Sequence, residues 1–135
     1  MKATEIPFVK LVGIKQEDNN LSLNINDNLL NHIKTIHASA QFTLAETRSG
    51  TFLQELFPNL ENQVIPVLRD SQIKFKKPAI EKIIAFAKTS DENIAKFKEQ
   101  FNKKGRATIT VDVEIKDVNG VLTSLSTFNW FVQKV

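Results

Sequence analysis

The segment that most constrains the fold of this chain is residues 36–56, which are predicted to form one long helix. Pro58 follows and ends it, because proline cannot continue a helix. The helix is rich in small side chains, which let a neighbouring backbone approach closely. These are Ala38, Ser39, Ala40, Ala45, Ser49 and Gly50. We expect such a helix to be wrapped by a sheet and not to lie on the surface.

Two short strands are predicted before this helix, at residues 14–17 and 21–25, and residues 6–12 form a short helical turn ahead of them. In the second strand apolar residues alternate with polar ones, so one of its faces is expected to be buried. The buried face would carry Leu21, Leu23 and Ile25, and the other face Ser22 and Asn24.

After the long helix, two further strands are predicted at residues 64–76 and 82–88, the first of them broken by Pro66. Residues 91–104 then show the spacing of an amphipathic surface helix, with a capping serine before it and a glycine after it. This second helix separates the strands at 64–88 from the end of the chain.

The most regular strand pattern lies at residues 107–116, where odd-numbered positions are apolar and even-numbered positions are polar. A turn at 117–120 leads into a last strand at 121–132. Runs of neighbouring strands favour antiparallel pairing. The sequence therefore predicts one α+β domain over residues 1–135, with an antiparallel sheet of five to six strands and one central helix.

Composition and charge exclude several classes of protein. Cysteine is absent, so disulfides, thiolate nucleophiles and Cys-based zinc sites are excluded, and two histidines give no ligand set for zinc. The formal net charge of +3 is too small to indicate nucleic acid as a partner. No N-terminal apolar run indicates a signal peptide, and no stretch approaches the ~20 apolar residues that cross a bilayer. We expect a soluble cytoplasmic protein without a metal site.

The spacing of His37 and Glu46 is the main functional signal. Nine helical residues correspond to about 900°, or half a turn beyond two full turns, and to an axial separation of roughly 13 Å. The two side chains therefore lie on opposite sides of their own helix. If both act on one substrate atom, Glu46 must meet the His37 region of a second subunit, so the spacing predicts a twofold dimer with shared sites.

The segment from Asn31 to Gly50 resembles the hot-dog-fold acyl-CoA thioesterases, most closely the phenylacetyl-CoA thioesterase type and its uncharacterised bacterial relatives. That family has an Asn, then His-Gly six residues later, then Asp or Glu nine beyond the His. Asn31, His37 and Glu46 fall in this register. The likeness extends over nearly the whole chain from residue 13. The sequence departs from the pattern at Ala38, where the family has Gly.

The resemblance implies a curved sheet around the long helix, a dimer or dimer of dimers, and hydrolysis of a thioester without a metal or redox cofactor. Glu46 would be the general base or the nucleophile, and the Ala38 N–H would stabilise the developing oxyanion. Asn31 and His37 would position water or the carbonyl and hold the loop, and Thr47 would orient the water. A structural alternative for Glu46 is an ion pair with Arg48 or another cation.

Basic residues near two strand ends suit the phosphates of coenzyme A. Arg106 is the strongest of these candidates, followed by Lys104 and Lys76. The alternative is that each is an ordinary solvated surface charge. Either an acyl-CoA or an acyl-carrier thioester fits the predicted substrate.

Two other functions stay open at this point. One is an enoyl-thioester hydratase or dehydratase on the same fold, because the spacing of Asp27, His32 and Glu46 is similar to that of such enzymes, although the supporting Gly and Pro residues are missing. The other is a non-catalytic acyl-CoA-binding dimer, which the methyl group of Ala38 favours.

Overall fold

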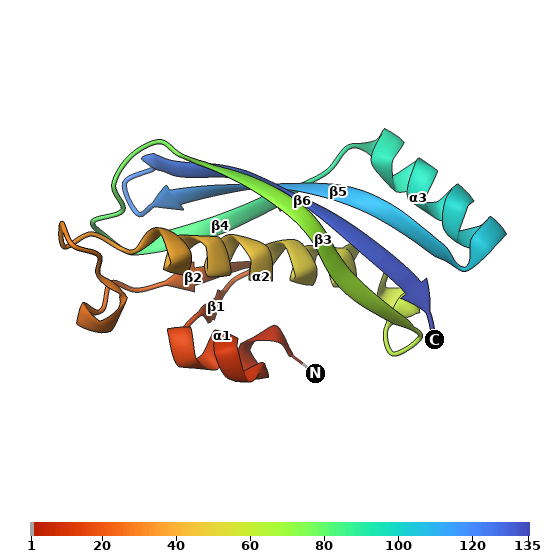
Figure 1. The fold of residues 1–135 in the computed structure, drawn as a ribbon, viewed down its shortest axis with the longest axis horizontal. Coiled ribbons are helices and arrows are strands. Elements are labelled where there is room, and N and C mark those ends of the chain that lie inside the picture. Colours follow the sequence, from red (N-terminus) through yellow and green to blue (C-terminus); the bar gives the residue numbers. More distant parts are fainter. Residues whose placement is uncertain (1) are drawn as a thin grey trace.

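A computed structural model describes residues 2–135 as a curved, six-stranded antiparallel sheet with one long helix running along its concave side (Figure 1). The strand order across the sheet is β1-β2-β4-β5-β6-β3. This confirms the predicted α+β architecture and the central helix. The strands are β1 (Lys15–Glu17), β2 (Asn20–Leu23), β3 (Val64–Phe75), β4 (Ile83–Lys88), β5 (Arg106–Asp117) and β6 (Leu122–Lys134).

The helices are α1 (Pro7–Val12), α2 (Ala38–Leu56) and α3 (Asp91–Lys104), with short 3-10 turns at Ala3–Glu5, Asp27–Leu29 and Pro58–Leu60. The central helix α2 begins two residues later than predicted, because His37 is its N-cap. The imidazole Nδ1 of His37 accepts a hydrogen bond from the Ser39 N–H at 2.9 Å. Within residues 2–135, no helix is long and apolar enough to cross a membrane.

The core lies between α2 and the concave face of the sheet. The predicted alternation of β5 is confirmed, since its apolar residues from Ala107 to Ile115 are buried against the helix. On α2 the small residues permit close packing: Ala45 and Ser49 are fully buried, and the Trp130 ring lies beside Gly50, 3.5 Å from where an added Cβ would stand. Small side chains therefore bring α2 close to β6, as the sequence predicted.

Helix α3 covers a free edge of the sheet. Strand β4 pairs with residues 112–117 of β5, so the first half of β5 has no strand beside it there. The Gln100 side chain takes the place of a partner strand and accepts a hydrogen bond from the Thr108 N–H at 3.0 Å. Phe97 anchors the helix from the inside by stacking on Phe57, with ring centroids 4.4 Å apart. Covering an edge in this way prevents unwanted strand pairing.

Two details of the predicted strands are wrong. Pro66 does not break β3, which is continuous; the proline is tolerated because β3 is an edge strand, where a missing N–H can face away from the partner strand β6. The pairing shifts instead between Leu68 and Asp70, at a bulge. In β2, Ser22 is buried and Ile25 is exposed, because the strand ends at Leu23 and other elements cover both of its faces.

Candidate active site

Glu46 lies in the middle of α2, on the side of the helix that turns toward β3. Two neighbours fix this orientation. The Phe42 ring packs on Phe128 of β6 with centroids 5.6 Å apart, and the Ser49 hydroxyl accepts a hydrogen bond from Trp130 Nε1 at 2.9 Å. Glu46 is turned about 40° from Phe42 and about 60° from Ser49, in the same direction around the helix axis. Its carboxylate therefore lies beyond the β6 contact, where β3 is the next strand.

The Glu46 carboxylate has no structural partner. Burial raises the pKa of Glu46 above its ordinary value, with no cation to offset the desolvation. No ion pair or hydrogen bond to its side chain occurs within residues 2–135. The predicted alternative of a pair with Arg48 is wrong, because the Arg48 guanidinium binds Glu55 in a two-point contact at 3.1–3.2 Å. An unpaired, half-buried carboxylate is typical of a functional group.

His37 and Ala38 form the N-terminal end of α2. The His37 N–H donates to the Leu29 carbonyl at 2.7 Å, and its imidazole caps the helix, so His37 fixes the direction of the first helical turn. The Ala38 N–H has no acceptor among the described residues. A free N–H at a helix N-terminus carries the positive end of the helix dipole, which suits a developing negative charge.

Asn31 organises the loop that leads to this helix end. Its carboxamide oxygen accepts from the Ile33 and Thr35 N–H groups, each at 3.0 Å, and its Nδ2 donates to Thr35 Oγ1 at 2.8 Å. The Asn31 N–H also donates to the Thr35 carbonyl at 2.8 Å. Both ends of the carboxamide are thus committed to the loop.

Thr47 points away from Glu46. It is buried, and its hydroxyl donates to the Thr43 carbonyl at 2.6 Å. One residue along a helix is a rotation of about 100°, which takes Thr47 off the side that faces β3. Thr43, three residues before Glu46, is on that side and only about 60° from it. Sequence reasoning missed Thr43, although its helical spacing from Glu46 was available as a signal.

On β3, two apolar residues face the same space as Glu46. Ile73 and Phe75 pair with Ser126 and Ser124, which are buried on the helix side of β6. Paired residues in antiparallel strands point to the same face. Phe75 is nevertheless 44% exposed, because the described part of the chain does not cover it. We call Thr43, Glu46, Ile73 and Phe75 the α2–β3 face.

The three predicted cations for coenzyme A do not come together. Arg106 pairs with Gln133 on β6, whereas the Lys76 N–H donates to the Thr123 carbonyl at 2.8 Å. Along β6, Thr123 and Gln133 are ten residues apart, which corresponds to roughly 33 Å. Lys76 therefore lies at the end of the sheet near the start of α2, and Arg106 and Lys104 lie at the other end.

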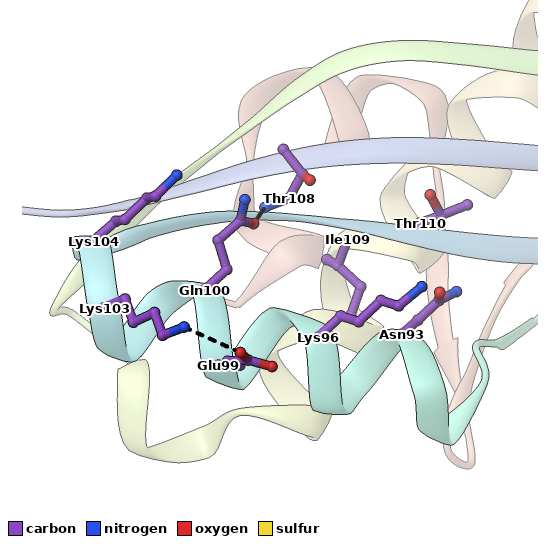
Figure 2. A pocket seen from close by; sticks show the side chains of 9 residues that line it. All are labelled: Asn93, Lys96, Glu99, Gln100, Lys103, Lys104, Thr108, Ile109 and Thr110. Atoms are coloured by element: carbon purple, nitrogen blue, oxygen red, sulfur yellow. Dashed lines mark hydrogen bonds and ion pairs between the residues drawn. The ribbon is translucent and has the colours of Figure 1, made fainter.

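Lys104 lines a groove between α3 and β5, and its neighbours there are mostly polar (Figure 2). Two of its cations are already paired within α3, Lys103 with Glu99 at 3.2 Å and Lys96 with Glu92 at 3.0 Å. The groove's threonines, at positions 108 and 110, alternate with buried residues and face away from α2. The groove thus opens on the opposite face of the sheet from Glu46.

A metal site is not formed by these groups, since no three His, Asp or Glu side chains gather in a metal-binding arrangement anywhere in residues 2–135. Glu46 does not have His37 beside it in its own chain, because the two residues are nine helical positions apart, roughly 13 Å along the axis. The chemistry available to one copy of the chain at Glu46 is therefore that of a lone carboxylate.

Comparison with known proteins places the chain in a family. Residues 7–132 match the family described as Domain of unknown function (DUF4442). The chain belongs to this family. Among curated proteins, none matches it.

Solved structures establish the fold of this DUF4442 protein as the hot-dog fold. A Pseudomonas aeruginosa protein described as "Probable Thioesterase" superposes with a TM-score of 0.82 at 23% identity, covering 98% of this chain and 91% of that chain. A Chlorobaculum tepidum protein of unknown function gives 0.83 at 16% identity, covering 98% and 90%. A Bacillus halodurans protein solved with CoA gives 0.72 at 20% identity, covering 93% and 74%.

Proposed function

We propose that this DUF4442 protein hydrolyses an acyl-CoA-type thioester to a free acid and a thiol. The observation that carries the proposal is Glu46, an unpaired carboxylate with a raised pKa on the α2–β3 face. Two similar structures support this assignment at the level of the fold: the Pseudomonas protein is described as a probable thioesterase, and the Bacillus protein was solved with CoA.

Glu46 acts in this proposal as the general base. It takes a proton from water while the water oxygen attacks the thioester carbonyl, and the tetrahedral oxyanion forms next to the Ala38 N–H of the partner subunit. The C–S bond then breaks, and the proton passes from Glu46 to the leaving thiolate. A buried base with a raised pKa suits this proton transfer better than a fully solvated carboxylate does.

The site requires two subunits, because Glu46 and Ala38 of one chain are too far apart. A twofold axis relates position 46 of one helix to position 37 of the other only if it passes level with their midpoint, between residues 41 and 42. Gln41 is hydrogen-bonded to Thr123 on β6, whose carbonyl accepts from the Lys76 N–H. Phe42 packs on Phe128 of β6, which pairs with Ser71 of β3. The axis is therefore expected near the middle of 71–76.

Strand β3 is suited to this pairing. It is a 12-residue edge strand whose outer hydrogen-bonding groups have no partner in the described part of the chain. Long unprotected edges pair with other strands. Antiparallel pairing of β3 with its own copy would extend the sheet, and the α2 helix of the partner subunit would cover Ile73 and Phe75. The same contact would bury the half-buried side of Glu46 further.

The function is tested by a hydrolysis screen over acyl-CoA chain lengths with detection of the free thiol. Glu46→Gln, which keeps the shape of the side chain, should lower kcat by about 10²–10⁴-fold. The matched control is Glu61→Gln, an exposed residue outside α2, which should leave turnover unchanged. Binding of acyl-CoA without turnover would favour the non-catalytic dimer, and hydration of an enoyl thioester would favour the hydratase; either result refutes the hydrolase.

The shared site is tested by cross-linking, which the absence of cysteine makes straightforward. Directly opposite residues in paired antiparallel strands have Cβ atoms about 4.5–5.5 Å apart, and closer in non-hydrogen-bonded pairs, which is near the 3.5–4.5 Å that a disulfide needs. Only the residue on the axis is opposite its own copy, so either Ile73→Cys or Lys74→Cys should give a covalent dimer on mild oxidation, and Val67→Cys should not. A monomer at micromolar concentration, or cross-linking through Val67→Cys alone, would contradict the proposed arrangement.

A further inference from the structure

Three lysines lie on the two chain segments next to the helix end that carries the Ala38 N–H. Lys34 belongs to the Asn31 loop, and Lys76 and Lys77 follow the last residue of β3. All three side chains are exposed, and none forms an ion pair within residues 2–135. In contrast, Lys82, which comes shortly after them, is paired with Glu17 at 2.6 Å.

The two segments that carry these lysines are joined to each other and to α2. The Ile36 N–H donates to the Ala79 carbonyl at 2.9 Å, so residues 31–36 run beside residues 76–80. The Lys76 and Lys77 N–H groups both donate to the Thr123 carbonyl, at 2.8 and 3.3 Å. These bonds hold the backbone of the lysines in place and bring them near the start of α2.

The position of Lys34 is fixed in addition by the Asn31 loop. Its backbone is left-handed, with φ of 62°, and its N–H donates to the Asn31 carbonyl at 3.1 Å. Because the Asn31 carboxamide also holds the residues on both sides of Lys34, the loop presents this charge from a defined turn. A preorganised charge binds an anion at a smaller entropic cost than a mobile one does.

The charge balance of these segments is one-sided. Residues 31–38 and 76–80 contain three lysines and no Asp or Glu. The nearest acidic residues along the chain are Asp27 and Glu81, and the Glu81 carboxylate already accepts a hydrogen bond from the Asn119 side chain. The patch around Ala38 is therefore positive, whereas the α3 groove that contains Lys104 pairs most of its charge internally.

We infer that Lys34, Lys76 and Lys77 bind the phosphate groups at the nucleotide end of coenzyme A. This inference rests on the proposed function, because the thioester carbonyl at the Ala38 N–H places the rest of the CoA at that helix end. The phosphates then lie over the loops of the same subunit that supplies the oxyanion donor. Within that subunit, Lys104 and Arg106 lie at the other end of the sheet, roughly 33 Å from Lys76 along the strands, and are too far away to bind the same molecule.

The probe is coenzyme A itself, the proposed product, with pantetheine as the analogue that lacks phosphates. In isothermal titration calorimetry, Lys34→Glu/Lys76→Glu should weaken CoA binding by about tenfold or more, because each exposed charge contact is worth up to ~1 kcal/mol and both are reversed. Pantetheine affinity should stay unchanged. The effect on CoA should shrink as salt is raised, since exposed charges are screened.

Two further double variants make the result decisive. Lys10→Glu/Lys98→Glu reverses two other exposed and unpaired lysines and should change CoA affinity less than threefold. Lys104→Glu/Arg106→Glu tests the other end of the sheet. If that variant weakens CoA binding and Lys34→Glu/Lys76→Glu does not, the inference is wrong. Lys34→Gln/Lys76→Gln, which only removes the charges, gives the same comparison if the reversal variant fails to fold.

Failure of this inference is distinguishable from failure of the proposed function. Thiol release that depends on Glu46, together with CoA binding that ignores the lysines, would leave the hydrolase standing and overturn the lysine site. Lysine-dependent CoA binding without any hydrolysis would leave the lysine site standing and overturn the hydrolase. Turnover of an acyl-carrier thioester with no measurable CoA affinity would also overturn the lysine site, because the acidic partner would then be a protein.

Discussion

Replacing Ser49 by alanine tests whether α2 is held to the sheet as the structure describes. The Trp130 indole N–H donates to the Ser49 hydroxyl at 2.9 Å, and both residues are buried. Ser49→Ala leaves that N–H without an acceptor in a site that water does not reach. A buried donor without a partner costs about 1–3 kcal/mol.

Two smaller terms adjust this cost. The Ser49 hydroxyl also donates to the Glu46 carbonyl at 2.7 Å, but that carbonyl keeps its ordinary helical hydrogen bond when the hydroxyl is removed. Alanine is a better helix former than serine by a few tenths of a kcal/mol. The net loss is about 1.5 kcal/mol, which lowers Tm by roughly 6 °C for a chain of this size.

The assay is thermal unfolding by circular dichroism at one fixed protein concentration, because dimerisation would make Tm depend on concentration. Ser126→Ala is the control: its buried hydroxyl donates to the Val113 carbonyl at 3.2 Å, so its loss leaves no N–H unpaired and should cost less. In the Trp130→Phe background, which has no indole donor, Ser49→Ala should cost almost nothing. Equal losses in both backgrounds would refute the argument, since the coupling between the two residues would be absent.

Three further perturbations follow from the same structure. Burial raises the pKa of Glu46 above 4.5, so the folded protein keeps a proton there that the unfolded chain releases. The stability that comes from this proton is present at acid pH and is lost as pH rises through the raised pKa. Glu46→Gln should therefore unfold at a higher temperature than the wild type at pH 8 and at a similar temperature at pH 4. Hydrolysis by the wild type should increase with pH as the carboxylate forms. A pH-independent difference in Tm would contradict the raised pKa. Asn31→Ala should cost about 1–2 kcal/mol, because the Ile33 and Thr35 N–H groups lose the one oxygen that accepts from both of them. Asn31→Asp keeps an acceptor oxygen at that place and should cost less, and urea unfolding distinguishes the two variants. Gly50→Ala should stabilise the protein by up to ~1 kcal/mol, because the helix loses a flexible residue and the new Cβ contacts Trp130 at an ordinary distance of 3.5 Å. A drop in Tm would show that α2 packs more tightly on β6 than described.

Local patterns predicted the elements that depend on neighbouring residues alone. The alternation at 107–116 gave β5 with the correct buried face, and the caps at Ser90 and Gly105 gave the ends of α3. The small residues of α2 indicated that a sheet would pack closely on it, and the complete burial of Ala45 and Ser49 confirms this. These predictions succeed because periodicity and capping act over a few residues.

The errors have a common cause, which is that nothing in a short window shows what lies beside it. Pro66 looks like a strand breaker, but it is tolerated because β3 is at the edge of the sheet. Ser22 looks like a solvent-facing residue, but other parts of the chain bury it. Thr47 follows Glu46 in sequence, yet one helical step turns it into the interior, while Thr43 shares the side of Glu46.

The sequence by itself determined the class of fold, the long helix and the spacing that separates Glu46 from His37 by half a turn, because these follow from the geometry of one helix and from side-chain periodicity. The tertiary structure decided which groups are free to react or bind. It paired Arg48 with Glu55 and left Glu46 unpaired, and it committed the Asn31 carboxamide to its own loop. It also separated Lys76 from Arg106 by the length of the sheet, because contacts between distant segments depend on strand order, which no local pattern contains.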